Sequence, residues 1–176
     1  MINKLLSIVL LITFIGSTSP KKIGKTIYKA IKSENIKTVE SLILSKNEFS
    51  ELMQNMDPKP KQEQIDMMLK NYDDRKKRFL DSYFDDIKEY DLSTMKVEAI
   101  EYGYHIGKPG KDLKVTWPES KDYKIKYNSS ELVKIQYSVK LKDETNSYSL
   151  QFEMMNYKDE WRFINMLRPP YIQTNE

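Results

Sequence analysis

The chain has 176 residues, with 29 Lys and Arg against 26 Asp and Glu, one histidine and no cysteine. The lack of cysteine excludes disulfides, cysteine-based zinc sites and a lipid-modified N-terminal cysteine, and a single histidine excludes a multi-histidine metal site. A net charge of +3, built from many charges of both signs, gives no strong field that attracts nucleic acid. We therefore predict a packed domain with no cofactor, no metal and no nucleic-acid partner.

Residues 1–19 have the three-part layout of a secretory signal peptide. Lys4 precedes an apolar run that ends at Ile15, and small residues follow the run. The run is shorter than the roughly 20 apolar residues that a membrane-spanning helix needs. We predict export, to a periplasm or out of the cell, with no stable membrane span after the signal is removed. Because Pro20 comes next, both the site and the occurrence of cleavage are left open.

Apolar residues recur at helical spacing through the first half of the chain, as in Ile23, Ile27 and Ile31. Helices are predicted from about 22 to 32, 36 to 43, 47 to 56 and 61 to 88, the third of them capped near Asn47. The last one has a gap in its apolar stripe from Arg75 to Arg78. That gap fits a kink, a solvent-facing turn or a ring of paired charges.

After Asp91 the apolar period changes to two residues, which is typical of strands. Strands are predicted near residues 95–106, 113–117, 123–127, 133–141, 148–154 and 161–167. A shift of phase near Ala99 predicts a β-bulge in the first strand. We expect Pro169 and Pro170 to end the sheet and residues 171–176 to form a loose tail.

Each strand has one apolar face and each helix has one apolar stripe, so the helices must pack their apolar stripes on the apolar face of the sheet. Residues 20–170 are therefore predicted to form a single α+β domain, with N-terminal helices packed on one face of a curved antiparallel sheet. The opening helical pair, the bulged strand and the turn-Trp-basic-apolar segment from Lys158 to Phe163 are similar to the cystatin-like, or nuclear transport factor 2-like, superfamily. That resemblance implies a cone-shaped domain with a pocket between helix and sheet. Members range from isomerases and dehydratases to binding modules, so the fold does not choose a function.

Motifs that would carry catalysis are incomplete. Gly24-Lys25-Thr26 lacks the earlier glycine and the strand of a phosphate-binding loop. His105 is expected to face water from its strand. The basic run from Arg75 to Arg78 has aspartates four residues away on both sides, which favours a self-neutralised helix face. Lys134, Lys140 and Arg162 are among the basic residues of the outward sheet face, which fits either solubility or an anionic partner.

Aromatic residues are the candidates for a ligand pocket, because no acid or base occupies the inward positions of the clearest strands. The candidate pocket residues are Tyr83, Tyr102, Tyr104, Tyr137 and Trp161, and ordinary core residues are the alternative. We expect an exported, non-catalytic domain that binds a protein partner or an apolar small ligand in its helix–sheet cleft or on its open sheet face. The alternative is a small isomerase- or hydrolase-like enzyme that uses a helix–sheet pocket. The oligomeric state is not defined by the sequence.

Overall fold

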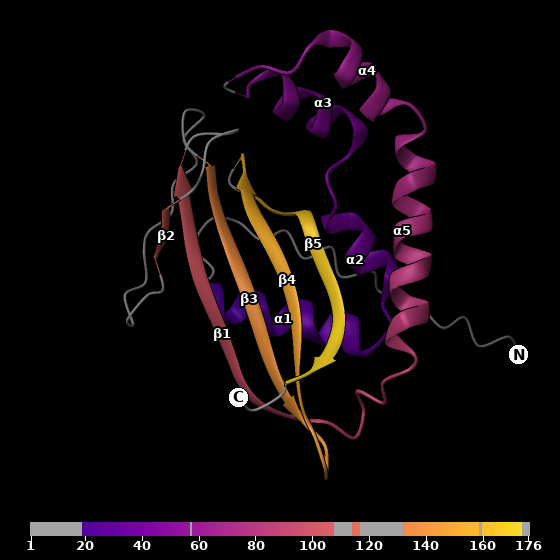
Figure 1. The fold of residues 1–176 in the computed structure, drawn as a ribbon, viewed down its shortest axis with the longest axis vertical. Helices are drawn as coiled ribbons and strands as arrows, with labels where there is room; N and C mark the ends of the chain where they lie inside the picture. The colour runs from indigo at the N-terminus through magenta and orange to yellow at the C-terminus, as the bar shows by residue number, and fades with distance from the viewer. Residues whose placement is uncertain (1–18, 57, 108–113, 117–131, 159, 174–176) are drawn as a thin grey trace, which may run out of the picture.

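A computed structural model describes residues 19–56, 58–107, 114–116, 132–158 and 160–173. In this part of the chain, five helices precede an open antiparallel sheet of five strands (Figure 1). The helices are α1 (Pro20–Lys32), α2 (Ile36–Leu42), α3 (Lys46–Gln54), α4 (Gln62–Leu69) and α5 (Tyr72–Ile87). The strands are β1 (Lys96–Gly107), β2 (Lys114–Thr116), β3 (Leu132–Lys142), β4 (Ser147–Tyr157) and β5 (Glu160–Ile172). The predicted α+β class is confirmed.

The strands lie in the order β2-β1-β3-β4-β5, and every neighbouring pair is antiparallel. The register between β1 and β3 shifts between Val97 and Ala99, which confirms the predicted bulge. β5 forms one edge of the sheet. The predicted signal peptide and the predicted strand at 123–127 lie outside the described residues, apart from Ser19.

β5 runs through Pro169 and Pro170 to Ile172, so the predicted end of the sheet before residue 171 is wrong. Ile172 lies opposite Tyr148, and a register shift in β4 between Ser149 and Gln151 takes up one extra residue of β5. Prolines are tolerated at bulges and on an edge strand, where one side of the backbone needs no ladder partner.

The core lies between the sheet and helices α1, α2 and α5. Ile23, Ile27 and Ile31 have no exposed surface, and they share one cluster with alternate residues of β3 and β4. Figure 1 shows α1 crossing behind the curved sheet and α5 standing beside β5. The Tyr137 hydroxyl donates to the Pro20 carbonyl at 3.0 Å, so the start of α1 is tied to the middle of β3.

The predicted helix over 61–88 is instead two helices, because Asn71 adopts a left-handed backbone conformation with φ 56°. Asparagine tolerates this conformation better than most residues. The break therefore falls before Tyr72, and not at the predicted gap of Arg75 to Arg78, which is regular helix. α4 turns away to lie beside α3, beyond the ends of the strands (Figure 1).

The third helix begins earlier than predicted. Its N-cap is Ser45, whose side chain accepts from the Glu48 backbone N–H while the Glu48 carboxylate accepts from the Ser45 backbone N–H. This capping box satisfies two amides that the helix itself leaves unpaired. Within the described ranges, no helix is long and apolar enough to cross a membrane.

Candidate functional site

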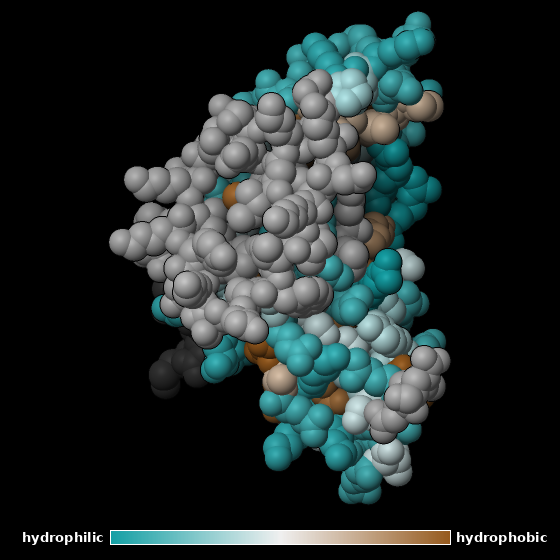
Figure 2. Space-filling model, turned by 60° about the vertical axis from the view of Figure 1, so that its left-hand side comes forward, coloured by the Kyte–Doolittle hydropathy of each residue, from teal (hydrophilic) through white to brown (hydrophobic). Residues whose placement is uncertain are grey.

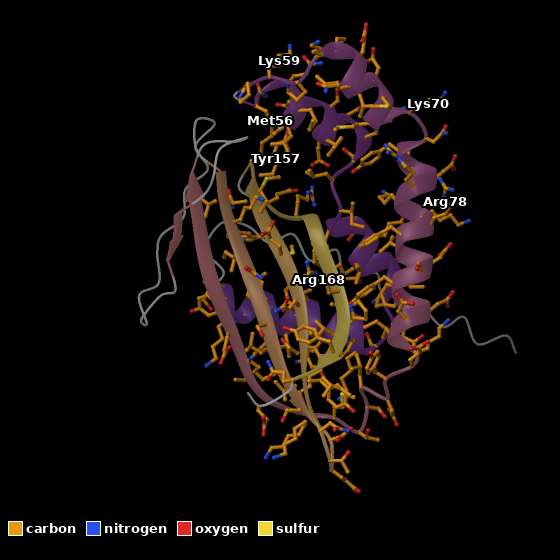
Figure 3. All side chains as sticks on the ribbon, in the orientation of Figure 1. Met56, Lys59, Lys70, Arg78, Tyr157 and Arg168 are labelled. Atoms are coloured by element: carbon orange, nitrogen blue, oxygen red, sulfur yellow. The ribbon has the colours of Figure 1, made fainter. Side chains whose placement is uncertain are left out.

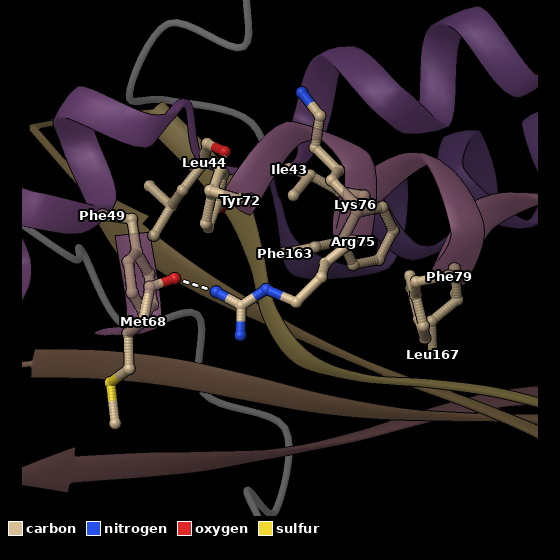
Figure 4. A pocket seen from close by; sticks show the side chains of 10 residues that line it. All are labelled: Ile43, Leu44, Phe49, Met68, Tyr72, Arg75, Lys76, Phe79, Phe163 and Leu167. Carbon is tan, nitrogen blue, oxygen red and sulfur yellow. Dashed lines mark hydrogen bonds between the residues drawn. The ribbon is translucent and has the colours of Figure 1, made fainter. Parts of the chain in front are cut away.

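A pocket of about 320 Å³ opens between α5, the edge strand β5 and the chain that leads into α3 (Figure 4). Its described lining consists of Ile43, Leu44, Phe49, Met68, Tyr72, Arg75, Lys76, Phe79, Phe163 and Leu167. Most of these side chains are aliphatic or aromatic, and the two cationic ones both come from α5. The pocket is thus an apolar space with a basic edge.

One face of α5 supplies four of the lining residues. Tyr72, Arg75, Lys76 and Phe79 follow the i, i+3, i+4, i+7 spacing that places side chains along one side of a helix. Arg75 and Lys76, which interrupt the apolar stripe in the sequence, therefore form part of the pocket wall. The spacing is present in the sequence, but Arg75 and Lys76 are charged, so a search for apolar residues at helical spacing does not find it.

The opposite wall is the outer edge of the sheet. Phe163 and Leu167 project from β5, and Ile43 forms an isolated parallel bridge with Phe163. That single bridge brings the chain after α2 alongside β5 before α3 begins. Phe49 and Leu52 of α3 pack against a second small cluster, formed by Leu44, Met155 and Tyr157, at the end of β4.

Tyr72 fixes the α5 side to the α3 side. Its hydroxyl donates to the Leu44 carbonyl at 2.8 Å, and its ring stacks on Phe49 with the centroids 5.2 Å apart. Burial, followed by the negative charges of Asp73 and Glu48, raises the pKa of Tyr72 to about 12. At neutral pH the phenol therefore keeps its proton and acts as a donor.

Ion pairs secure α3 to β5 and to the turn that precedes it, next to the pocket. Lys158 lies 2.7 Å from the Glu51 carboxylate, and Arg162 lies 3.2 Å from Glu48. Arg162 also donates to the Ser41 carbonyl at 3.3 Å. These pairs and the small apolar cluster position Phe49, which forms the α3 end of the pocket.

The polar edge of the pocket uses its two cations differently. The Arg75 guanidinium donates to the backbone carbonyl of Met68, in the last turn of α4 (Figure 4). The Lys76 ammonium lies 3.8 Å from Glu40 and is directed away from the pocket (Figure 4). Among the described lining residues there is no carboxylate, imidazole, serine or threonine. The described surroundings suit binding better than proton transfer or nucleophilic attack.

The aromatic residues predicted to line a pocket lie elsewhere. Tyr83 is buried behind the pocket wall, with its ring stacked 6.4 Å from that of Phe79. Tyr137 is fully buried between Tyr102 and Phe152, and Trp161 is also buried in the core. The side chain of the fifth candidate, residue 104, is outside the described part. None of the four described candidates lines this pocket.

The predicted basic sheet face is largely paired where its side chains are described. Lys134 lies 3.2 Å from Glu153, and Lys140 lies 3.8 Å from Glu101. On α5 the predicted pairs four residues apart are not formed, and the residues from Asp73 to Arg78 are exposed apart from half-buried Lys76. Figure 2 brings the β1 and β2 side of the molecule forward, and the described surface in this view is mainly hydrophilic, with small separate apolar patches. No group of three acidic or histidine side chains within the described ranges could hold a metal ion.

No protein-family model, curated protein or solved structure matches this chain. The function must therefore be inferred from the chemistry of the pocket and from the sequence of residues 1–19.

Proposed function

We propose that this protein is an exported, non-catalytic binding domain that holds an apolar small molecule between α5 and β5. The observation that carries the proposal is the 320 Å³ pocket. Apart from Tyr72, Arg75 and Lys76, its described lining side chains contain only hydrocarbon, phenyl or thioether groups. The proposal that the protein is exported rests on the signal-like sequence of residues 1–19, and recovery of the protein outside the cytoplasm tests this part of the proposal.

The size and the lining of the pocket support a small ligand. Pockets that enclose small molecules have volumes of roughly 300–1,000 Å³ and mainly apolar walls with a few polar groups. Phe79 and Met68 are 44% and 37% exposed, which leaves apolar surface for a ligand to cover. Covering such surface is favourable by about 25 cal/mol for each Å² removed from water. A pocket between helix and sheet is also what the layout resemblance to the cystatin-like superfamily implies.

The alternative of an isomerase- or hydrolase-like enzyme has less support. Such an enzyme needs a titratable group within hydrogen-bonding distance of the reacting atom. Among the described lining residues, the Lys76 ammonium is paired with Glu40. The Tyr72 hydroxyl is already bonded to the Leu44 carbonyl. Its pKa of about 12 is also far from the neutral range in which a general base works well.

Titration with Nile red, a neutral dye that fluoresces in apolar surroundings, tests the pocket. We expect saturable binding of one dye molecule per chain. Phe79→Ala should weaken it about tenfold, because losing an aromatic contact worth about 1.4 kcal/mol corresponds to that factor. Met68→Ala should weaken it several-fold, since each lost buried methylene is worth about 0.8 kcal/mol.

Met67→Ala is the matched control, because Met67 is the neighbouring methionine on α4, is 65% exposed and does not line the pocket. It should leave dye binding unchanged. Non-saturable binding, or equal weakening by Met67→Ala and Met68→Ala, would contradict the proposal. Native mass spectrometry of the purified full chain gives an independent reading, in which a bound apolar molecule is expected to disappear in Phe79→Ala.

A further inference from the structure

Arg75 occupies a distinctive position in the pocket. Its side chain runs from α5 toward α4, between the Phe49 and Met68 end of the pocket and the Phe79 and Leu167 end (Figure 4). The residue as a whole is exposed, so ligand and solvent can both reach it. The guanidinium thus lies where the polar end of an amphiphile would meet the aqueous phase.

In the part of the chain that the structure describes, no carboxylate balances the charge of Arg75. Within the described part of the chain, no acidic side chain lies within 4.0 Å of its guanidinium, whereas Lys76 pairs with Glu40 and Arg162 pairs with Glu48. A guanidinium carries five N–H donors in a planar fork. Its hydrogen bond here is a single contact to the Met68 carbonyl, so donors remain for a ligand.

We infer that the natural ligand is a single-chain amphiphile with a carboxylate head, held by Arg75 while its apolar tail lies against Phe79 and Leu167. This inference rests on the proposed binding function and names its ligand class. The fork of the guanidinium matches the two oxygens of a carboxylate. No described lining residue adds negative charge that would repel the carboxylate.

The bond to Met68 gives Arg75 a second role. It holds a carbonyl from the last turn of α4, where the helix leaves such groups without internal partners. Because the fork has more than one donor edge, Arg75 can keep this bond and donate to a carboxylate at the same time. The ligand head would then lie at the junction of α4 and α5, next to the break at Asn71.

Three ligands with the same twelve-carbon chain test the inference on the full chain: dodecanoate, dodecanol and dodecylamine. Each is measured by displacement of Nile red at concentrations below its aggregation limit. We expect dodecanoate to bind about tenfold more tightly than dodecanol, as for one charge-assisted hydrogen bond in a partly solvated site. Dodecylamine should bind most weakly. Added salt should reduce the advantage of dodecanoate, since exposed charges are screened.

Arg75→Gln should reduce the ratio of dodecanoate affinity to dodecanol affinity from about tenfold to about one. Arg78→Gln is the matched control, because it removes the same charge three residues away on a side chain that points away from the sheet and does not line the pocket (Figure 3). Thermal unfolding of both variants checks that they are folded. If Arg75→Gln is unfolded, the preference for dodecanoate is measured instead in Arg75→Lys and, at increasing salt, in the unaltered protein.

Equal binding of dodecanoate and dodecanol by the unaltered protein would overturn the inference and leave the apolar binding function intact. A dodecanoate preference that survives in Arg75→Gln, or that is lost equally in Arg78→Gln, would also overturn the role of Arg75. Failure of all three ligands and of Nile red to bind would refute the proposed function, and the inference with it.

Discussion

Replacing Gly24 with alanine is expected to destabilise the protein, although alanine normally stabilises a helix. Gly24 lies in the middle of α1, where that helix crosses the sheet. A Cβ atom at this position would lie 2.8 Å from two carbons of the Tyr137 ring and 3.1 Å from a methyl carbon of Ile100. The close approach of α1 to β3 therefore depends on the missing side chain.

The magnitude follows from two opposing effects. Alanine in place of glycine favours the helix by about 1 kcal/mol. Overpacking a core costs about 1–3 kcal/mol, and more when the neighbouring side chain cannot move. Tyr137 is held in place: it is fully buried, its hydroxyl donates to Pro20 at 3.0 Å, and its ring stacks on Phe152 at 4.8 Å. We expect a net loss of about 1–2 kcal/mol, which lowers the melting temperature by roughly 3–6 °C for a domain of this size.

Urea unfolding followed by circular dichroism measures the change. Lys25→Gly is the control for helix propensity, because Lys25 is exposed on the same helix and should lose about 1 kcal/mol from propensity alone. In the double variant Gly24→Ala with Tyr137→Leu, the ring is gone, so the total loss should fall short of the sum by about 2 kcal/mol, which is most of the overpacking cost. A Gly24→Ala protein as stable as the original would refute the reasoning, since it would mean that α1 does not lie this close to β3.

Two further predictions concern a carboxylate in the turn between β3 and β4 and a pair of hydroxyls in the sheet. The backbone N–H groups of Asn146 and Thr145 lower the pKa of Asp143 from 3.8 to about 2, so its contribution to stability is present above pH 4 and is lost as the pH falls toward 2. Asp143→Asn should therefore lower the urea midpoint at pH 6, with the difference shrinking toward pH 2, and a constant difference would contradict this. The buried hydroxyls of Ser138 and Ser149 lie 2.9 Å apart, so replacing either one by alanine should cost about 1–2 kcal/mol by stranding its partner. The urea midpoint of the double alanine variant should be lowered by less than the sum of the two single decreases. Decreases that are fully additive would count against a shared hydrogen bond.

The strands were predictable because alternation is a local property. In β3 the residues from Val133 to Leu141 alternate without exception, and all five apolar ones are buried. The bulge near Ala99 was predictable for the same reason, since it reverses the parity of the apolar residues. The break at Asn71 was missed, because the apolar pattern continues on both sides of a single residue in the left-handed conformation.

The pocket shows where local patterns stop being sufficient. The four lining residues of α5 have helical spacing, but which side of α5 meets β5 depends on where α4 ends and where the chain after α2 passes. The isolated bridge between Ile43 and Phe163 joins residues far apart in the sequence. The carbonyl that Arg75 binds belongs to another helix. The aromatic candidates chosen from the sequence, such as Tyr137, are buried in the core because rings are favoured there whether or not a ligand is bound.

The sequence alone determined the class of the fold, the location of most helices and strands, and the absence of cysteine-based chemistry, because periodicity and composition are carried by neighbouring residues. The tertiary structure decided that α1 approaches the sheet at Gly24 and that β5 forms the edge beside α5. It also decided that Arg75 stands without a carboxylate partner, in the described part of the chain, beside an apolar pocket. These features depend on which distant segments come together, and burial of the whole core fixes that arrangement.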